Sequence, residues 1–502
     1  MPYRLIKLSV LIVFIFCNTH LDAQLINHYW IQNFNSVSSL IGGAVVAGDG
    51  DNSSIYYNPA TIVEMQQGSN VSVAANLFSW NIYNNYNALG EGNDLHNTNF
   101  QVQPQFFSFT YKPKKGNLSY AFSILTRTSE DYLSAYANSE IYDILPRLQG
   151  EEIYNTIFTY RNKYYDTWIG LGFGGRLNNG FSYGATLFVS ASGLIYNFAY
   201  SASAYNFTDS TNNNLYPSFV SESAYSEHVK FTQYRIITKF GLAYKINNWR
   251  FGLVVTTPSL NVYTSGRVAT RMKTQINIHN SNGMHIPDFE IFSAQEKDQL
   301  KANYKYPFAI SFGFIGTFKE GRQKLYFSME YFNRIKPYNM ISAEIDPNIT
   351  SPTVYDSLPN KDYLTYVYKA DPVFNVAIGY SWIIRKNMKF VNAIRTDFTS
   401  INNINSEELN GYNFIKTDNF NIYHYSAGLN FLFKKNKVTA GLEFSYGYKN
   451  DEQQIVNFND AVEFNPETGD ALLGPVNNNA YLRYYGINLY ISATLNFIKK
   501  DN

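Results

Sequence analysis

The sequence almost entirely lacks cysteine. Its 502 residues include one, Cys17, which lies in a short apolar stretch near the N-terminus. Ile15 and Phe16, just before it, do not supply the small residue that a lipoprotein signal requires, so we interpret Cys17 as an apolar filler. If that stretch is removed, the mature chain carries no thiol, which excludes disulfide scaffolds, cysteine metal sites and thiol catalysis.

The chain also lacks an excess of charge of either sign. It has 40 basic and 39 acidic residues, for a net charge of +1. Nucleic-acid-binding domains usually concentrate positive charge in a patch or stripe. We therefore expect no nucleic-acid partner.

The usual residue patterns of metal, cofactor and catalytic sites are missing as well. The seven histidines are scattered without ligand spacing. The turn Asp49-Gly50-Asp51-Asn52-Ser53 is similar to the start of a calcium loop. However, Ser54 stands where such a loop needs Gly, and Ala60 stands where it needs Glu. No Ser/His/Asp set, carboxylate pair or phosphate-binding loop is present, so we expect no metal, no cofactor and no enzyme activity.

Long hydrophobic runs are absent too. No apolar stretch after the N-terminus reaches the ~18 residues needed for a spanning helix. The N-terminus itself has a basic Arg4 and Lys7, a short apolar core over Leu8 to Phe16, and a small Ala23, which together predict a signal peptide over residues 1–23. An exported chain without spanning helices can still enter a membrane as a closed β-barrel.

What the sequence does contain is a high aromatic content, 17%, and long stretches of strict alternation. The clearest lies near the C-terminus, over residues 488–497. One face of this stretch is polar, and the other consists of Leu489, Ile491, Ala493, Leu495 and Phe497. A period of two residues with one apolar and one polar face is typical of a strand between lipid and water.

Short connections give the strand count. Six of them, each flanked by two strand patterns, predict hairpins, and one further strand is expected before them, over about 69–81, and one after them, over 481–497. The total is fourteen antiparallel strands with six tight turns and seven long loops, an asymmetry typical of bacterial outer-membrane barrels with both termini on the periplasmic side. The hairpins lie near residues 104–127, 160–193, 229–264, 307–335, 370–398 and 421–449.

A soluble all-β protein is the alternative, but it should bury its apolar face against a second sheet and rarely has loops this unequal. The loops near 205–228, 265–306, 399–420 and 450–480 are rich in Asn, and we expect them to be solvated. Within the second of these loops, residues 288–301 have Phe289, Phe292 and Leu300 at helical spacing, which predicts a short amphipathic helix.

In the mature chain, residues 24–68 precede the first expected strand. A fourteen-stranded barrel has a lumen too wide for its own side chains to fill. We therefore expect this segment to plug the lumen, which argues against an open aqueous porin. Its small residues allow close packing, and Pro59 restricts Asn58 to an extended or turn conformation.

The stretch Ser39 to Ala47, followed by Asp51 to Ala60 and then a strand, resembles the start of the FadL/OmpP1 family. The resemblance implies an all-β fold: a fourteen-stranded antiparallel transmembrane barrel over residues 69–502 with an N-terminal hatch in its lumen. It also implies an outer-membrane location and passive transport of a hydrophobic small molecule of the long-chain fatty acid or aromatic hydrocarbon class. This chain departs from the family in ending five residues after its last aromatic residue, Phe497.

The candidate site residues follow from the plug and the wall. Asn58, Pro59 and Ala60 are expected to form the hatch turn, although they could equally be a turn that only seals the lumen. Tyr56 and Tyr57 could line the ligand path or simply pack there. Seven charged residues should face the lumen by alternation, as a carboxylate anchor or as an ion network that braces the plug: Arg235, Lys239, Lys245, Glu330, Arg395, Asp397 and Glu443.

Two functional hypotheses stay open. The first is the passive transporter, whose partners are outer-membrane lipid and a hydrophobic ligand. The second is an accessory barrel subunit of an outer-membrane assembly or protein-secretion complex, because a fold does not fix a function. A barrel enzyme would need convergent polar residues that the sequence does not reveal.

Overall fold

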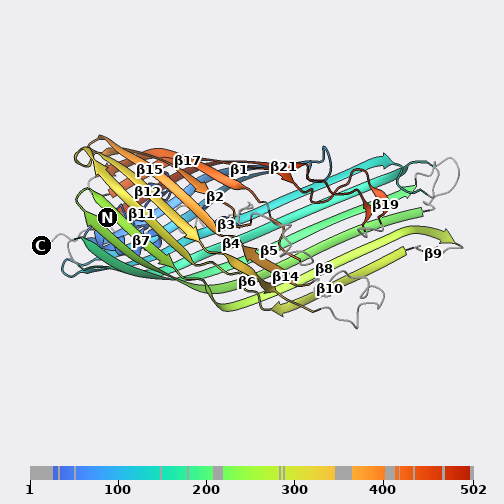
Figure 1. Ribbon diagram of the computed structural model, residues 1–502, viewed down its shortest axis with the longest axis horizontal. Helices are drawn as coiled ribbons and strands as arrows, with labels where there is room; N and C mark the ends of the chain where they lie inside the picture. Colours follow the sequence, from blue (N-terminus) through green and yellow to red (C-terminus); the bar gives the residue numbers. More distant parts are fainter. Residues whose placement is uncertain are drawn as a thin grey trace, which may run out of the picture.

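The computed structural model describes most of the chain as a single barrel (Figure 1). The described residues are 27–31, 34, 36–49, 52–146, 150–177, 180–206, 219–281, 284–286, 289–344, 364–401, 413–417, 419–433, 436–465 and 470–497. The expected signal peptide and the tail after Phe497 lie outside them. No helix in these ranges is long and apolar enough to cross a membrane.

Fourteen antiparallel strands close the barrel, as the turn count predicted. The first and last strands pair with each other, from Ser69 with Phe497 to Tyr86 with Tyr481. Two of the fourteen are interrupted, so each consists of two separate elements. The wall consists of β1 (Gly68–Tyr86), β2 (Leu95–Lys112), β3 (Leu118–Tyr142), β4 (Glu152–Arg176), β5 (Phe181–Asn206), β6 (Phe219–Ile246), β7 (Trp249–Thr256) with β8 (Leu260–Ser281), β10 (Phe289–Leu300) with β11 (Ala309–Phe318), β12 (Gln323–Phe332), β15 (Val373–Arg385), β16 (Met388–Asp397), β17 (Asn421–Phe433), β18 (Asn436–Glu452) and β21 (Ala480–Phe497).

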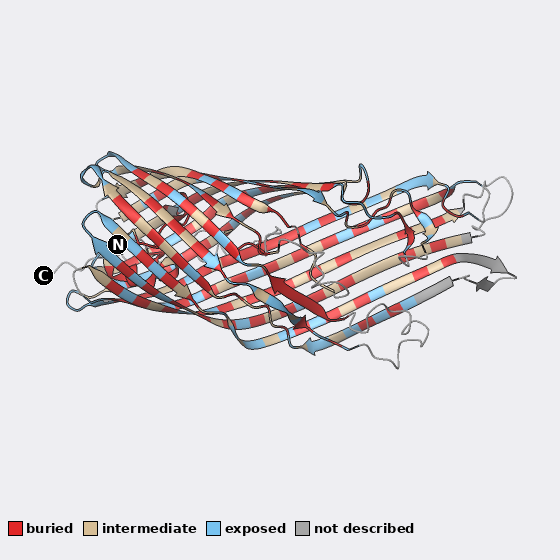
Figure 2. Ribbon diagram, viewed as in Figure 1, coloured by how far each residue is buried: buried red, intermediate tan, exposed pale blue. Residues whose placement is uncertain are grey.

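Burial alternates along the strands, as Figure 2 shows. On β18, for example, Glu443 is fully buried, whereas its neighbours Leu442 and Phe444 are 37% and 47% exposed. Apolar side chains facing outward and polar ones facing inward are what a strand between lipid and a lumen requires. The alternation therefore identifies the outer face as the lipid face.

The wall is much longer on one side than on the other (Figure 1). β5 has 26 residues, whereas β16 has 10. At about 3.3 Å per residue β5 runs for about 85 Å, and a spanning strand needs only ~9–11 residues. The strands β3–β6, β8 and β10 therefore continue past the membrane, away from the tight turns, and we call this part the extension.

The extension overturns several loop expectations. β5 and β6 run into the first expected loop, and β8, β9 (Met284–Ile286) and β10 fill most of the second. The region 450–480 carries the hairpin β19 (Val462–Phe464) and β20 (Ala471–Leu473), and its Val456 and Phe458 are buried. In the region 399–420, Ser400 and Phe420 are buried, and residues 402–412 and 418 lie outside the described residues. In the first two regions, the polar composition suggested loops because the outer face of the extension meets water rather than lipid.

The expected helix over 288–301 is wrong. Residues 289–300 form β10, which pairs with β8 from Phe289 with Ile276 to Lys297 with Val268. The helical spacing of three apolar residues is a weak local signal. The strand ladder with β8 supplies partners for the backbone over nearly the whole stretch, so tertiary context decides the conformation.

The described residues between Asn27 and Gln67, which we call the N-terminal segment, lie inside the barrel. The segment contains α2 (Ser36–Leu40), α3 (Ser54–Tyr57) and the 3₁₀ helix η1 (Pro59–Glu64). α2 packs against β16, β17, β18 and β21, whereas η1 packs against β3–β6, on the opposite wall. The segment therefore crosses the lumen.

Wall glycines permit this close approach. A Cβ added at Gly241 would come within 2.1 Å of Asn58 Oδ1, and one at Gly252 would come equally close to the carbonyl oxygen of Val46. Neither position could carry a larger residue without moving the segment. Sequence reasoning missed these glycines. Glycine at a lumen-facing strand position indicates that another part of the backbone approaches closely, so the pattern could have identified them.

Candidate functional site

The Asn58-Pro59-Ala60 turn is anchored by one side chain. Asn58 is extended, with φ −157° and ψ 102°, which confirms the restriction expected before proline, and Pro59 opens η1. The Asn58 amide nitrogen donates to the carbonyl oxygens of Val46 at 2.7 Å and Leu242 at 3.0 Å, and its oxygen accepts from the Ala60 N–H at 3.0 Å. Asn58 thus caps η1. It also links the turn to Val46, elsewhere in the segment, and to Leu242 of β6.

Replacing Asn58 should loosen the segment. We expect Asn58→Ala to lower the hydrogen-exchange protection of residues 52–67 by about tenfold or more, because buried groups left without partners cost about 1–3 kcal/mol. Asn58→Asp should lower it similarly, since a carboxylate cannot donate to Val46 or Leu242. Asn81→Ala is the matched control, because among the described residues the Asn81 side chain bonds Ser79 and Tyr484, both of the wall. Unchanged protection in both Asn58 variants would contradict this role.

Six of the seven charged residues expected in the lumen are buried. Arg235, Lys239, Glu330, Arg395, Asp397 and Glu443 are each at most 8% exposed. Lys245 is the exception: it lies in the last pairs of β6 with β7, next to the tight turn, where residues 244–249 are all exposed and burial no longer alternates. Arg235 belongs to the wall alone, since it pairs with Asp166 at 2.8 Å and donates to the Tyr304 carbonyl at 2.9 Å.

Four of these charged residues surround Trp30 of the N-terminal segment. The Trp30 N–H donates to Asp397 at 3.1 Å, and its indole N–H donates to Glu330 at 2.6 Å. Arg395 donates to the Trp30 carbonyl and also pairs with Glu443 at 3.2 Å. The geometry is that of an ion network bracing the segment against β12, β16 and β18. Trp30 itself was not singled out in the sequence, although Trp is rare in this chain.

Asp49 provides a second attachment, which sequence reasoning treated only as part of a turn. Its carboxylate pairs with Lys324 at 2.6 Å and Lys389 at 3.3 Å, and it accepts from the Tyr326 hydroxyl at 3.1 Å. Burial alone would raise the pKa of Asp49, but the two ammonium groups outweigh it and hold the pKa well below its usual range. Asp49 therefore stays ionised and fastens the segment to β12 and β16.

The depressed pKa of Asp49 predicts a pH dependence. Because the pKa is lower in the docked segment than in the unfolded chain, the pairing stabilises docking above about pH 4 and is lost as the pH falls through the folded-state pKa. We expect constant exchange protection of residues 36–49 from about pH 5 to 8 and a decline only below about pH 4. Asp49→Asn should lower the protection between pH 5 and 8 and abolish this acid dependence. An unchanged acid decline in Asp49→Asn would assign the dependence to another group.

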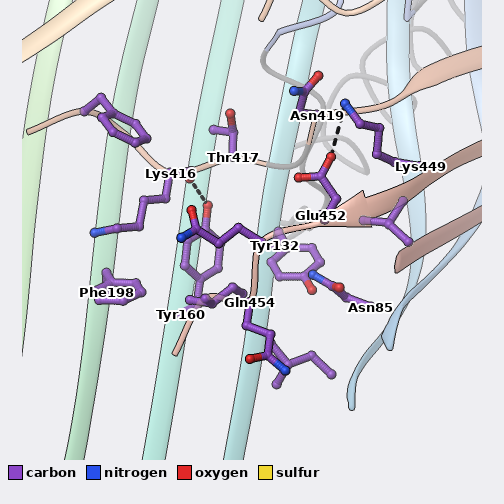
Figure 3. Close-up of a pocket in the computed structure, with 15 residues that line it drawn as sticks. Asn85, Tyr132, Tyr160, Phe198, Lys416, Thr417, Asn419, Lys449, Glu452 and Gln454 are labelled. Atoms are coloured by element: carbon purple, nitrogen blue, oxygen red, sulfur yellow. Dashed lines mark hydrogen bonds and ion pairs between the residues drawn. The ribbon is translucent and has the colours of Figure 1, made fainter. Parts of the chain in front are cut away.

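A cavity of about 200 Å³ opens among the described residues at the extension end of the barrel, and we call it the entrance cavity. Figure 3 shows Tyr132, Tyr160 and Phe198 of β3–β5 lining it, with Lys416, Lys449 and Glu452 around them. Lys449 pairs with Glu452 at 3.2 Å, and Lys416 lies 3.9 Å from the centre of the Phe198 ring. The remaining lining residues are Asn85, Leu95, Phe414, Thr417, Asn419, Gln453, Gln454, Ile455 and Leu482.

Smaller cavities continue from the entrance cavity toward the N-terminal segment. One of about 30 Å³ shares Phe414 and Thr417 with it and is lined mainly by apolar and aromatic side chains, including Leu194 and Phe231. Its Tyr368 packs against Tyr304, with ring centres 4.6 Å apart. The two cavities adjoin, and both are lined in part by aromatic side chains, so we call the pair the aromatic route.

A third cavity, of about 20 Å³, lies against the segment itself. Tyr56 and Tyr57 both line it, with Lys239 and Glu330 from the wall. The Lys239 ammonium lies 4.1 Å from the centre of the Tyr56 ring, which suits a cation–π contact. The structure thus brings the two tyrosines of the sequence motif and two of the six buried charges to one place.

Arg127 is a further residue that sequence reasoning missed. It lies at a register shift between Thr126 and Thr128 and points into the barrel, where its guanidinium donates to the Tyr29 carbonyl at 2.8 Å. It also lies 5.3 Å from the centre of the Tyr306 ring. Its position continues the inward series of Ala121, Ser123 and Leu125 along β3, so strand alternation was a signal that could have placed this side chain.

The walls of these cavities offer mainly apolar and aromatic surface with a few charged groups. Such a lining suits the binding of a hydrophobic molecule. Within the described ranges, no group of three or more His, Cys, Asp or Glu residues could hold a metal ion.

The comparisons with known proteins bear on the fold. No family model and no curated protein matches the chain. Among solved structures, it is similar to the Pseudomonas putida toluene transporter TodX, with 10% identity, 93% of this chain and 100% of that chain covered, and a TM-score of 0.55. It is also similar to a Pseudomonas aeruginosa FadL homologue, with 10% identity, coverage of 94% and 100%, and a TM-score of 0.53. The CymD monoaromatic hydrocarbon channel shares 14% identity, with coverage of 93% and 100% and a TM-score of 0.50.

Proposed function

From the premise that the chain has the fold of the FadL-type hydrocarbon channels, we propose that it carries hydrophobic compounds passively across the outer membrane. A ligand enters at the entrance cavity, follows the aromatic route and reaches the N-terminal segment, which acts as a movable hatch. The observation that carries this proposal is the set of aromatic-lined cavities, two that adjoin at the extension end and a third against Tyr56 and Tyr57. No catalysis or energy source is required.

The expected binding is weak enough for passage. A small hydrophobic ligand that buries about 200 Å² of apolar surface gains about 5 kcal/mol, before the costs of association are subtracted. Such a ligand is held long enough to concentrate in the route but is not trapped there. The charged groups around the entrance cavity would orient a ligand with a polar end without excluding an uncharged hydrocarbon.

Strand pairing favours a sideways exit. β2 and β3 pair only from Phe106 with Leu125 to Tyr111 with Tyr120, although both strands continue well beyond these residues. The register shift beside Arg127 begins where this pairing ends. We place the exit at this unpaired junction, where a ligand released from the hatch can pass into the outer membrane.

A second candidate function is an accessory subunit of a membrane assembly. On the outer face of the extension, Leu133, Ile141 and Ile157 are 54%, 64% and 53% exposed. Ile157 lies roughly 60 Å along β4 from its tight-turn end, well past the ~25 Å lipid-facing band even with ~45° of tilt. Exposed apolar side chains outside the lipid band suit contact with another protein.

Native mass spectrometry on protein gently extracted from its own outer membrane would separate the two functions. Transport predicts a lone barrel that carries a bound hydrophobic small molecule, whose mass distinguishes an alkyl carboxylate from a monoaromatic hydrocarbon. A stoichiometric protein partner on an empty barrel would instead favour the accessory role. Uptake of both ligand classes by cells expressing the protein is the complementary assay.

A further inference from the structure

A cavity larger than those of the ligand route lies away from that route, among the described residues. It measures about 370 Å³ and sits at the tight-turn end of the barrel, the end expected to face the periplasm. Six cationic residues and a single carboxylate, Asp49, line it. The lining residues are Val37, Asp49, Gly321, Arg322, Lys324, Ser381, Ile383, Arg385, Lys386, Asn387, Met388, Lys389, Asn430, Leu432 and Lys437, which together we call the basic pocket.

The positive charge of the basic pocket is only partly compensated. On the inner side of the pocket, Asp49 pairs with Lys324 and Lys389. In the part of the chain that the structure describes, no carboxylate forms an ion pair with Arg322, Arg385 or Lys386 at the rim. Like charges gathered in a concave site focus a strong field and attract an oppositely charged ligand.

The placement of the pocket points to a water-soluble occupant. Lys324, Ser381 and Lys389 lie on the lumen side of the wall, and Ser381 is 1% exposed. Trp382, next to Ser381, faces outward and is 47% exposed. The pocket therefore opens inside the end of the barrel, whereas lipid headgroups lie outside it.

The residue types point to carboxylates. The guanidinium groups of Arg322 and Arg385 can each bind a carboxylate through two parallel hydrogen bonds. Apolar side chains of Ile383, Met388 and Leu432 lie between the cations and suit the carbon chain of a peptide. Charge complementarity thus favours an acidic peptide segment over a small inorganic anion.

We propose that the basic pocket binds a carboxylate-rich segment of a periplasmic partner protein, which competes with Asp49 for Lys324 and Lys389. Such competition removes one attachment of the N-terminal segment from the side opposite to ligand entry. The binding itself does not depend on transport, and only its effect on the hatch rests on the function proposed above.

The test uses the full-length protein in nanodiscs of phosphatidylcholine, in low-salt buffer without phosphate. Fluorescence anisotropy of a labelled hexaglutamate peptide measures binding. We expect salt-sensitive binding that weakens about tenfold or more when Arg322, Arg385 and Lys386 are all changed to Gln. The control changes Lys115, Arg176 and Lys245 to Gln, which removes the same charge from other turns at the same end and should leave affinity unchanged.

Two single substitutions test the competition. Asp49→Asn frees Lys324 and Lys389 and should tighten hexaglutamate binding several-fold. Glu64→Gln removes one negative charge from another ion pair at the same end, with Arg250, and should have no effect. Equal effects of the two substitutions, equal effects of the two triple variants, or absence of peptide binding would each overturn the proposal. The proposal would also be overturned if the triple substitution of Arg322, Arg385 and Lys386 changed only the interaction of the protein with phosphatidylglycerol in the discs. That result would identify the pocket as a site for anionic lipid.

Discussion

Oxidation of a Gly42→Cys/Ala377→Cys variant is expected to reduce uptake of a hydrophobic ligand to background, and a reductant should restore it. A Cβ placed on Gly42 would lie 3.7 Å from the Cβ of Ala377, within the ~3.5–4.5 Å span of disulfide-bonded pairs. The bond would fix the N-terminal segment to β15. Since the hatch has to move for a ligand to pass, locking it should close the route completely. The only natural cysteine lies in the expected signal peptide, so no other thiol competes.

Each single-cysteine variant is a control for this experiment. Gly42 has a φ of 63°, and a Cβ there would also lie 3.1 Å from the Cβ of Ala393, so the substitution itself carries some strain. The single variants should transport equally with and without oxidant. Full transport by the oxidised double variant, with the disulfide confirmed by mass spectrometry, would show that the segment is a fixed plug rather than a hatch.

Replacing Arg395 by Met is expected to release the first part of the segment. Arg395 and Glu443 are 1% and 0% exposed, and removing one partner of such a buried pair costs about 3–5 kcal/mol. The carbonyl groups of Trp30 and Ile31 also lose their donor. Limited proteolysis should therefore cleave within residues 27–49 far faster than in the parent protein, while the strand ladders keep the barrel intact.

Arg235→Met is the matched control for the Arg395 variant. Arg235 is equally buried, but its partners Asp166, Ser190 and Tyr304 all lie outside the N-terminal segment. We expect it to destabilise the wall without exposing the segment to protease. Glu443→Leu combined with Arg395→Met should recover part of the protection, because the Glu443 carboxylate is then no longer buried without its guanidinium partner. Identical cleavage of the Arg395 and Arg235 variants would mean that the network does not hold the segment.

The local parts of this fold could be predicted from the sequence. Tight turns and strict alternation are properties of a few neighbouring residues, so the amino-acid pattern alone is enough to count fourteen strands. The inward direction of Arg395 and Glu443 follows from the same alternation, since a charge facing lipid is costly.

Other features depend on long-range contacts or on a change of solvent. Asp49 forms ion pairs with Lys324 and Lys389, which lie far from it in the sequence. No residue near Asp49 in the sequence indicates these partners. On β4, Ile169 and Leu171 face lipid, whereas Arg161 and Lys163 on the same face belong to the extension and meet water. Beyond the lipid band, the outward-facing residues of a strand need not be apolar. The sequence alternation is therefore weaker in the extension, and a strand there resembles a polar loop.

The extension, as the taller part of the wall, has two open sheet edges outside the membrane, one on β3 and one on β10. Beyond Thr126, β3 pairs only with β4 in the described part of the chain, and β10 pairs only with β8. Unpaired edges invite strands of other molecules to add to the sheet, and charged residues discourage this. Glu130, Asp131 and Glu140 lie on β3, and Glu296, Lys297 and Asp298 lie on β10. The charges on these two strands would thus keep neighbouring copies from joining edge to edge in a crowded outer membrane.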